Sequence, residues 1–345
     1  MDILINPYRA AHNDFPLGDE IPFPSTDAAA AQTLVARCPK AAPTPLRAAP
    51  DLAARAGVGS LWIKDERERM GLGSFKALGA AYVIACDHQQ GLAAGRTYVT
   101  ASAGNHGMSV AAGAAAFGAE AVIYIAQTVP EAFAQRLRAL GATVRRQGAI
   151  YEDSMAAAAQ AAVDEGFDLL SDSSWPGYTA RPHRLMEGYL VLMAEAIDQL
   201  PAAPSHIFLQ AGVGGLAGAC AALARQAWGD APKIIVTEPQ AAPALMESVK
   251  AGQAVTAVGP VSAMGRLDCK EPSLVALRGL ARDADVFVTL SEAEGDAGAQ
   301  AALDNGLAST PSGAAGLAAL LAGRGQFGLG ATSSVLCILS EGPET

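Results

Sequence analysis

The chain has 345 residues, of which 51% are hydrophobic and only 6% aromatic, and its formal net charge is −10. This length allows one large or two medium domains with a substantial core. The negative charge is spread along the chain and disfavours nucleic acids and anionic membranes as partners, and the lack of a signal-peptide pattern or a membrane-length apolar run predicts a cytoplasmic protein.

Short β-rich runs alternate with Ala-rich helical patterns after a Pro- and Ala-rich segment at residues 1–40, which we expect to be an N-terminal extension that wraps a domain or a subunit. Strands are predicted at 60–66, 96–102, 119–126, 142–148, 167–172, 205–212, 233–239 and 333–342. Helices are predicted at 75–91, 104–118, 130–141, 151–166, 181–200 and 214–228. This alternation predicts an α/β fold with parallel sheets covered by helices on both faces.

Ligands of such folds bind outside the carboxyl ends of the strands, so we expect the binding residues in the turns between strands and helices. In the turn at 210–219, an apolar strand leads into Gly212, Gly214 and Gly215 and then into a helix. Glycines and a helix N-terminus suit the binding of a phosphate. The same glycines, with Ala217 and Glu238, also fit a dinucleotide fingerprint, and glycines can serve only close helix–strand packing.

The turn at 100–111 carries Ser102, Gly104, Asn105 and His106 between a strand and a helix. Its backbone amides could hold a carboxylate. The alternative is an ordinary helix N-cap, for which Ser and Asn are also favoured.

Lys76 is a single cation between Phe75 and a run of small apolar residues, 77–81. A lone lysine is usually a solvated surface charge. If its surroundings are dry, however, burial lowers its pKa and makes the amine a nucleophile for a carbonyl.

Two more polar groups follow strands. Asp172 precedes Trp175 and Tyr178 and could face a substrate amine, or it could cap a turn. Ser340 ends a very apolar strand and could bond to a ring nitrogen, or it could be an ordinary turn residue. The histidines are well separated and the five cysteines show no paired spacing, so no metal site is predicted.

Five motifs in order resemble the fold type II (tryptophan synthase β-like) pyridoxal-phosphate (PLP) enzymes from residue 41 to the end. They lie at 42–46, 64–82, 102–107, 212–218 and 339–342. The segments 64–79, 171–189 and 264–273 are most similar to the diaminopropionate ammonia-lyase family. Ala103 departs from that family, which has an aspartate there that is credited with handling the D-isomer. Here the 102–107 loop is instead similar to that of threonine and serine dehydratases, although Thr310 stands where their motif has an acid.

The resemblance implies two open, twisted, mainly parallel sheets flanked by helices. It implies a large cofactor-binding domain formed by residues 41–85 and 195–345 and a small substrate-binding domain formed by residues 86–194. A homodimer is implied as well.

The resemblance also implies roles for individual residues. Lys76 would be the lysine that links to PLP and the base that removes the α-proton, and Asp172 would bind or protonate the leaving group. The other cofactor-binding residues would be Phe75, Asn105, Gly212, Val213, Gly214, Gly215, Leu216 and Ser340. The substrate would be bound by Ala101, Ser102, Ala103, Gly104, His106 and Asp172.

The expected reaction is β-elimination from a small β-substituted amino acid, similar to 2,3-diaminopropionate and with the L-isomer favoured, to a 2-keto acid and ammonia. A serine or threonine dehydratase and a β-replacement synthase stay open as alternatives with the same cofactor. A nicotinamide-dependent dehydrogenase is a distant alternative, because it leaves Lys76, Asn105 and Ser340 without a role.

Overall fold

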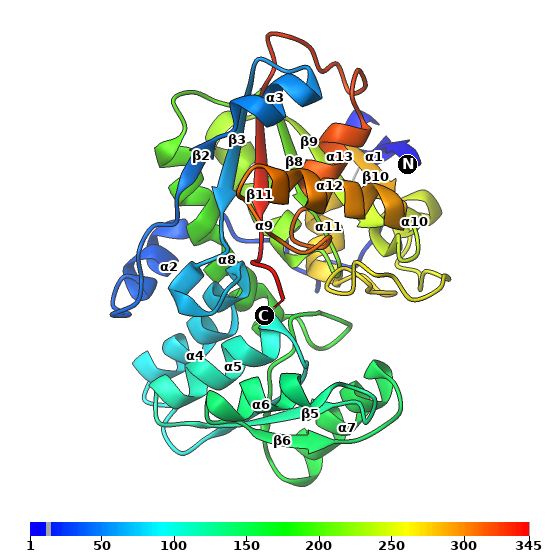
Figure 1. The fold of residues 1–345 in the computed structure, drawn as a ribbon. Coiled ribbons are helices and arrows are strands. Elements are labelled where there is room, and N and C mark those ends of the chain that lie inside the picture. Colours follow the sequence, from blue (N-terminus) through cyan, green and yellow to red (C-terminus); the bar gives the residue numbers. More distant parts are fainter. Residues whose placement is uncertain (12–14, 345) are drawn as a thin grey trace.

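The computed structural model describes residues 1–11 and 15–344. They form one sheet of seven strands and one of four strands. Figure 1 shows the large sheet with its helices in the upper part of the molecule and the small sheet in the lower part. We call these two parts the large unit and the small unit. The expected α/β fold with two mainly parallel sheets is confirmed.

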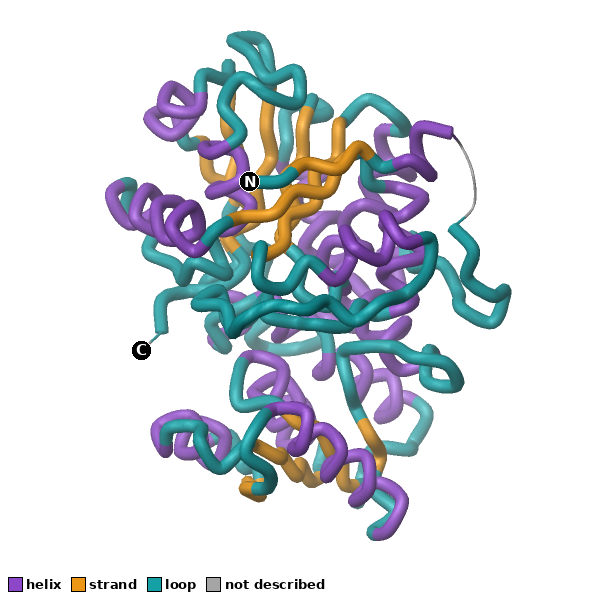
Figure 2. Tube along the Cα trace, turned by 90° about the vertical axis from the view of Figure 1, so that its right-hand side faces the viewer, coloured by secondary structure: helices purple, strands orange, loops and turns teal. Residues whose placement is uncertain are grey.

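The large sheet has the strand order β1-β10-β9-β8-β11-β3-β2. Its five central strands run parallel, and the edge strands β1 and β2 are antiparallel to their neighbours. The central strands form the group of orange strands in the upper part of Figure 2. The strands are β1 (Ile3–Ile5), β2 (Leu46–Ala48), β3 (Ser60–Asp65), β8 (His206–Gln210), β9 (Lys233–Pro239), β10 (Val286–Leu290) and β11 (Ser334–Leu339).

Alternate residues of the central strands enter two different cores, as expected for a sheet covered on both faces. Ile207 and Leu209 of β8 pack with the first group of helices, whereas Phe208 packs with the second. The first group is α8 (Ala180–Gln199), α9 (Gly215–Trp228), α10 (Ala244–Ala251) and α11 (Leu274–Asp283). The second group is α3 (Pro50–Ala56), α12 (Glu292–Asp304) and α13 (Ala315–Ala322).

The small sheet is entirely parallel and has the strand order β6-β5-β4-β7. Its strands are β4 (Thr97–Ala101), β5 (Glu120–Ile125), β6 (Thr143–Arg146) and β7 (Asp168–Leu169), and its helices are α4 (Ala80–Gln89), α5 (Asn105–Ala116), α6 (Glu131–Ala139) and α7 (Tyr151–Asp164). Helix α7 covers one face of the sheet. Tyr98 and Ile123 on the other face belong to the same core as α8 and α9, so the two units share one hydrophobic core.

The described part of the N-terminal segment lies against the large unit and α8. Strand β1 adds to the sheet edge beside β10, and α2 (Ala28–Val35) packs against α8. Between β1 and α1 (Pro7–Ala11), the buried Asn6 amide donates to the carbonyl oxygens of Ala281 and Ala284 at 2.9 and 2.7 Å and so completes the end of α11. The domain limits that the sequence suggested stay predictions.

The segment before α4 differs from the prediction. The sequence predicts one helix over 75–91, but the structure has short 3₁₀ turns at η1 (Arg69–Gly71) and η2 (Phe75–Leu78), and the α-helix begins only at Ala80. The chain bends at Gly79, where an added Cβ would lie 2.8 Å from the Tyr189 hydroxyl. This close contact with α8 places Lys76 on a turn between the two units. Among the described residues, no helix is long and apolar enough to cross a membrane.

Candidate active site

The predicted polar segments follow the carboxyl ends of strands in both sheets, and two contacts bring the two edges together. Lys76 lies on η2 after β3, and its ammonium contacts Asp172, which follows β7 of the small sheet. Asn105 begins α5 after β4, and its amide donates to Glu341, which follows β11 of the large sheet. The candidate active site therefore lies at the junction of the two units.

The ion pair of Lys76 and Asp172 has an Nζ–Oδ2 distance of 2.5 Å, and about a fifth of each side chain is exposed (21% and 17%). Burial by itself lowers the pKa of Lys76. The Asp172 carboxylate raises this pKa by more than burial lowers it, so the pKa lies above the ordinary value for lysine. The prediction that Lys76 has a lowered pKa is therefore wrong for this structure, because a carboxylate faces the amine.

The Asp172 carboxylate is correspondingly held as an anion. Burial raises the pKa of Asp172, but the charge of Lys76 and its hydrogen bond to the carboxylate outweigh burial and hold this pKa well below its usual range. A carboxylate with this pKa is ionised at neutral pH. It is suited to bind a cation and is a poor proton donor.

His106 is almost fully buried at the start of α5, and its imidazole contacts the segment that leads to Asp172. Its Nε2 lies 2.8 Å from the carbonyl oxygen of Leu170. Because burial lowers the pKa of His106, we assign a neutral ring whose Nε2–H donates to that carbonyl. The Nδ1 atom is buried and has no partner among the described residues.

The predicted phosphate loop lies between β8 and α9, at residues 212–216. Gly214 has a φ of +99°, which favours glycine, and α9 begins at Gly215 without a side-chain cap. The first amides of a helix have no acceptor within the helix, so here they can bind an anion. An added Cβ at Gly212 would lie 2.9 Å from the Cys269 Sγ, which shows how closely the loop is packed.

Two aromatic rings lie beside Lys76. Phe75 and Tyr189 meet edge to face with ring centroids 4.9 Å apart, and the Lys76 Nζ lies 5.3 and 5.8 Å from the two centroids. The Tyr189 hydroxyl is buried and has no hydrogen-bond partner among the described residues. Tyr189 was missed in the sequence because it lies within an apolar helical pattern, where a tyrosine resembles a core residue.

Asn105 and Ser340 flank a buried carboxylate that the sequence analysis also missed. Glu341 accepts hydrogen bonds from the Asn105 amide and the Thr310 hydroxyl and lies 3.7 Å from the Arg266 Nε. Ser340 is buried directly before it, and its carbonyl oxygen accepts from the Phe75 amide at 3.0 Å. The signal that could have identified Glu341 is its place directly after Ser340.

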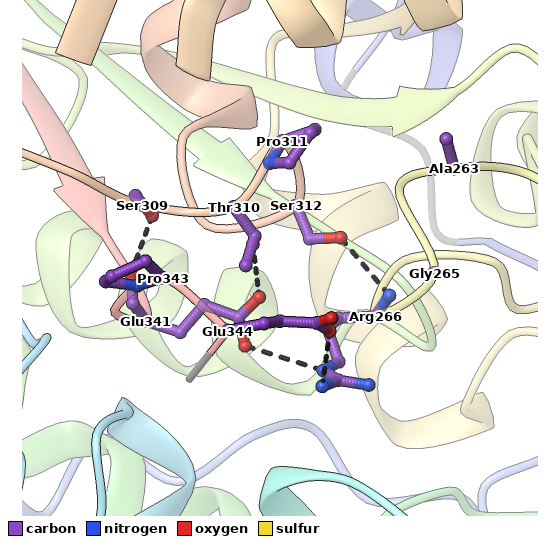
Figure 3. Close-up of a pocket in the computed structure, with 10 residues that line it drawn as sticks. All are labelled: Ala263, Gly265, Arg266, Ser309, Thr310, Pro311, Ser312, Glu341, Pro343 and Glu344. Carbon is purple, nitrogen blue, oxygen red and sulfur yellow. Dashed lines mark hydrogen bonds and ion pairs between the residues drawn. The ribbon is translucent and has the colours of Figure 1, made fainter. Parts of the chain in front are cut away.

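A cavity of about 340 Å³ opens next to Glu341 (Figure 3). Loops of the large unit form it, and it is polar on the side of Arg266, Thr310 and Glu341. Its lining residues are Ala263, Gly265, Arg266, Ser309, Thr310, Pro311, Ser312, Glu341, Pro343 and Glu344. Within the described ranges, no group of three His, Cys, Asp or Glu side chains is arranged to hold a metal ion.

The distant dehydrogenase alternative needs Glu238 to be free for a ribose. Glu238 is instead fully buried, and its two carboxylate oxygens accept from the amides of Leu245 and Met246 at 2.7 and 2.8 Å. The carboxylate thus caps α10 and is not available to a nucleotide.

The model of the family described as pyridoxal-phosphate-dependent enzymes matches residues 38–341. The chain belongs to this family. The expected cofactor and the fold type II assignment are confirmed, and the dehydrogenase alternative is wrong. The open amides at the start of α9 fit the phosphate of PLP, and Lys76 and Asn105 fit its polar ring substituents.

Diaminopropionate ammonia-lyases are among the relatives of this PLP enzyme. The enzyme of Salmonella typhimurium is 34% identical over 268 residues, which are 70% of this chain and 66% of that enzyme. The enzyme of Escherichia coli K12 is 32% identical over 273 residues, which are 72% of this chain and 68% of that enzyme. The alignments thus span about two thirds of these enzymes. An L-serine dehydratase/L-threonine deaminase of Mus musculus is 32% identical over 62% of this chain and 62% of that protein.

Solved structures agree with these relationships. The Escherichia coli diaminopropionate ammonia-lyase in complex with an aminoacrylate–PLP azomethine reaction intermediate has a TM-score of 0.88 and 30% identity. The match covers 99% of this chain and 93% of that chain. A processed threonine deaminase isoform of Solanum lycopersicum, 21% identical with a TM-score of 0.81, shares the fold.

Proposed function

We propose that this PLP enzyme is an ammonia-lyase that removes the β-amino group of L-2,3-diaminopropionate and produces a 2-keto acid and ammonia. The observation that carries the proposal is the ion pair between Lys76 and Asp172. It places an ionised carboxylate next to the amine proposed to hold the cofactor, in a chain similar to diaminopropionate ammonia-lyases over most of its length.

PLP supplies an electron sink that stabilises negative charge at the α-carbon of the substrate. Lys76 is proposed to be its attachment point and, when released by the substrate amine, the base that takes the α-proton. The open amides of α9 and the loop residues Gly212, Val213, Gly214, Gly215 and Leu216 would hold the phosphate. Phe75 would pack on the ring, Asn105 would bind the phenolic oxygen and Ser340 would face the ring nitrogen.

The substrate carboxylate is proposed to bind the loop formed by Ala101, Ser102, Ala103 and Gly104 and the first turn of α5. That helix begins without a side-chain cap, so its first amides are free for an anion. His106 would support this loop through its bond to Leu170 and need not touch the substrate.

Asp172 is proposed to bind the β-ammonium group of the substrate. The contact between the Lys76 ammonium and this carboxylate supports the proposal, because it places an ammonium group against Asp172. A β-ammonium group leaves as neutral ammonia when the Cα proton is lost and the carbon–nitrogen bond breaks, so it needs no further proton. A β-hydroxyl group, by contrast, leaves as water only with a proton, and an aspartate carboxylate that is ionised at neutral pH has none to donate.

One observation favours the alternative of a serine or threonine dehydratase. Ala103 has no acidic group and lies partly buried in the carboxylate loop, where the diaminopropionate lyase pattern has an aspartate. A β-replacement synthase with the same cofactor also remains open.

The test is a substrate panel with the purified PLP-loaded enzyme, measuring release of keto acid and ammonia. The panel contains L- and D-2,3-diaminopropionate, L-serine and L-threonine, with and without an added thiol. Fastest turnover of L-diaminopropionate is the expected result. Fastest turnover of L-serine or L-threonine indicates a dehydratase, and a thiol adduct indicates a synthase. The homodimer and the cytoplasmic location also stay predictions, which light scattering and cell fractionation test.

A further inference from the structure

Glu341 is a buried carboxylate at the junction of the two units, and no step proposed above uses it. It is 6% exposed and lies directly after β11. Its backbone forms a bridge with Ser74, two residues before Lys76, so it lies beside the segment that carries this lysine. A buried acid at this place needs hydrogen-bond donors, and the structure provides them.

Both carboxylate oxygens of Glu341 have a donor (Figure 3 shows the Thr310 side). The Thr310 hydroxyl donates to Oε1, and the Asn105 Nδ2 donates to Oε2, with the Arg266 Nε 3.7 Å from Oε2. The Thr310 hydroxyl in turn accepts from the Gly313 amide at 2.9 Å, so its own proton is directed toward Glu341. Residues of the large unit therefore hold the Glu341 carboxylate in place, and Asn105 of the small unit binds to it.

The hydrogen bond between Asn105 and Glu341 sets the orientation of the Asn105 amide group, that is, the directions in which its nitrogen and its oxygen point. Both oxygens of Glu341 accept a hydrogen bond, Oε2 from the Asn105 Nδ2 and Oε1 from the Thr310 hydroxyl, so the NH₂ group of Asn105 faces Glu341 and its amide oxygen faces elsewhere. The same nitrogen carries a second N–H. That second N–H has no partner among the described residues, and α5, which Asn105 begins, packs against η2, which carries Lys76.

We propose that Glu341 is a positioning residue that holds the Asn105 amide with its nitrogen turned toward the cofactor site, so that Asn105 donates to the phenolic oxygen of PLP. The inference rests on the proposed role of Asn105, and it adds the residue that sets the direction of that hydrogen bond. A donor at the phenolic oxygen stabilises its deprotonated form. Without Glu341 the amide is free to rotate, and this stabilisation is lost for part of the molecules.

The experiment compares the absorption spectrum of the bound cofactor across the pH range for the wild type, Glu341→Gln, Glu341→Ala and Glu344→Gln. Glutamine has nearly the size of glutamate, so it preserves the packing, but its single amide oxygen cannot accept from both Asn105 and Thr310, and the direction of the Asn105 amide is no longer fixed. Glu344→Gln is the matched control, because Glu344 bonds to the same Arg266 at 2.9 Å, is more than half exposed and does not contact Asn105.

In both Glu341 variants, the share of cofactor with a protonated phenolic oxygen is expected to rise at each pH. We also expect kcat to fall about tenfold or more, as for the loss of one hydrogen bond to a charged group, with little change in KM. Glu344→Gln is expected to match the wild type. If the Glu341→Gln spectrum coincides with that of the wild type over the whole range, the inference is overturned, even if the melting temperature falls.

The spectra of the loaded enzyme need no substrate, which separates this test from that of the proposed function. A wild type that binds PLP but does not consume diaminopropionate contradicts the proposed reaction and still allows the Glu341 comparison. A wild type that consumes diaminopropionate, with a Glu341→Gln variant of unchanged spectrum and kcat, contradicts only the role of Glu341.

Discussion

The Lys76 Nζ lies 2.5 Å from the Asp172 Oδ2, although 96 positions separate the two residues and they follow strands of different sheets. The pair connects the large unit to the small unit at the point where the cofactor is proposed to attach. It keeps Asp172 ionised and shows that the carboxylate accepts an ammonium group.

Asp172→Asn is expected to lower kcat/KM for L-2,3-diaminopropionate by about 100-fold or more, since it removes the charge that binds the β-ammonium. Activity with L-serine, whose leaving group is neutral, should fall much less. Steady-state assays of keto-acid release check this, with Asp168→Asn as a control, because Asp168 pairs with Arg96 and Arg181 away from Lys76. Equal losses with both substrates would show that Asp172 does not recognise the ammonium.

Ala103→Asp is expected to increase consumption of D-2,3-diaminopropionate relative to the L-isomer. The substitution places a carboxylate in the loop before α5, where the related lyase pattern has an aspartate and this chain has only a methyl group. Chiral assays of the remaining substrate measure the ratio, and Ala103→Asn serves as the uncharged control. A wild type that already consumes both isomers at equal rates would contradict this role of position 103.

Tyr189→Phe removes a buried hydroxyl that lacks a partner among the described residues. An unpaired buried hydroxyl costs about 1–3 kcal/mol, so the melting temperature of the cofactor-free protein should stay the same or rise. If the cofactor or the substrate complex supplies the missing partner, the same variant binds PLP about tenfold more weakly. Thermal unfolding and PLP titration check the two parts. Unchanged PLP affinity would show that the hydroxyl has no role in binding the cofactor.

The buried Glu238 carboxyl group is expected to make the stability of the folded protein depend on pH, independently of catalysis. Burial raises the pKa of Glu238 to about 8, whereas the amides of Leu245 and Met246 lower it. Because its ordinary pKa is 4.5, the folded state holds this proton more tightly than the unfolded state. The contribution to stability is thus complete below pH 4.5 and is lost as the pH rises through 8.

Glu238→Gln should therefore show a smaller fall in melting temperature between pH 6 and pH 9 than the wild type, about several degrees less. Its stability at pH 6 should be lower, since the amide group of glutamine cannot accept from both Leu245 and Met246. Glu120→Gln, at an exposed position on β5 of the small sheet, is the control. A fall of the same size in wild type and variant would contradict the raised pKa of Glu238.

Much of the site could be predicted because its parts follow the carboxyl ends of parallel strands, whose position in an α/β fold is fixed by topology. Local residue types were sufficient to select Lys76, Asn105 and the glycines at 212–215 as candidates, and the structure places them at strand ends, whereas their roles stay predictions. The direction of the Lys76 pKa could not be predicted, since it depends on a charge 96 positions away. Glu341 was missed for the same reason, because its two donors lie at positions 105 and 310 and its ion-pair partner lies at position 266.

For the fold, too, features set by local sequence patterns could be predicted, and features set by contacts with distant residues could not. The alternating segments from β3 to β9 and the last strand β11 were predicted with their type and approximate limits, whereas β10 and the helices α10 to α13 were not predicted. Strand β1 was missed because it has only three residues, and two of them, Ile3 and Ile5, are 42% and 62% exposed at the sheet edge. The bend at Gly79 depends on the close approach of Tyr189 from α8, which no local pattern indicates.

The most direct test of the central claim is the ratio of kcat/KM for L-2,3-diaminopropionate to that for L-serine, measured as keto-acid release by the PLP-loaded wild type. The ionised Asp172 beside Lys76 predicts that diaminopropionate is preferred by about 100-fold or more. A ratio of one or below, with normal cofactor binding, would contradict the account.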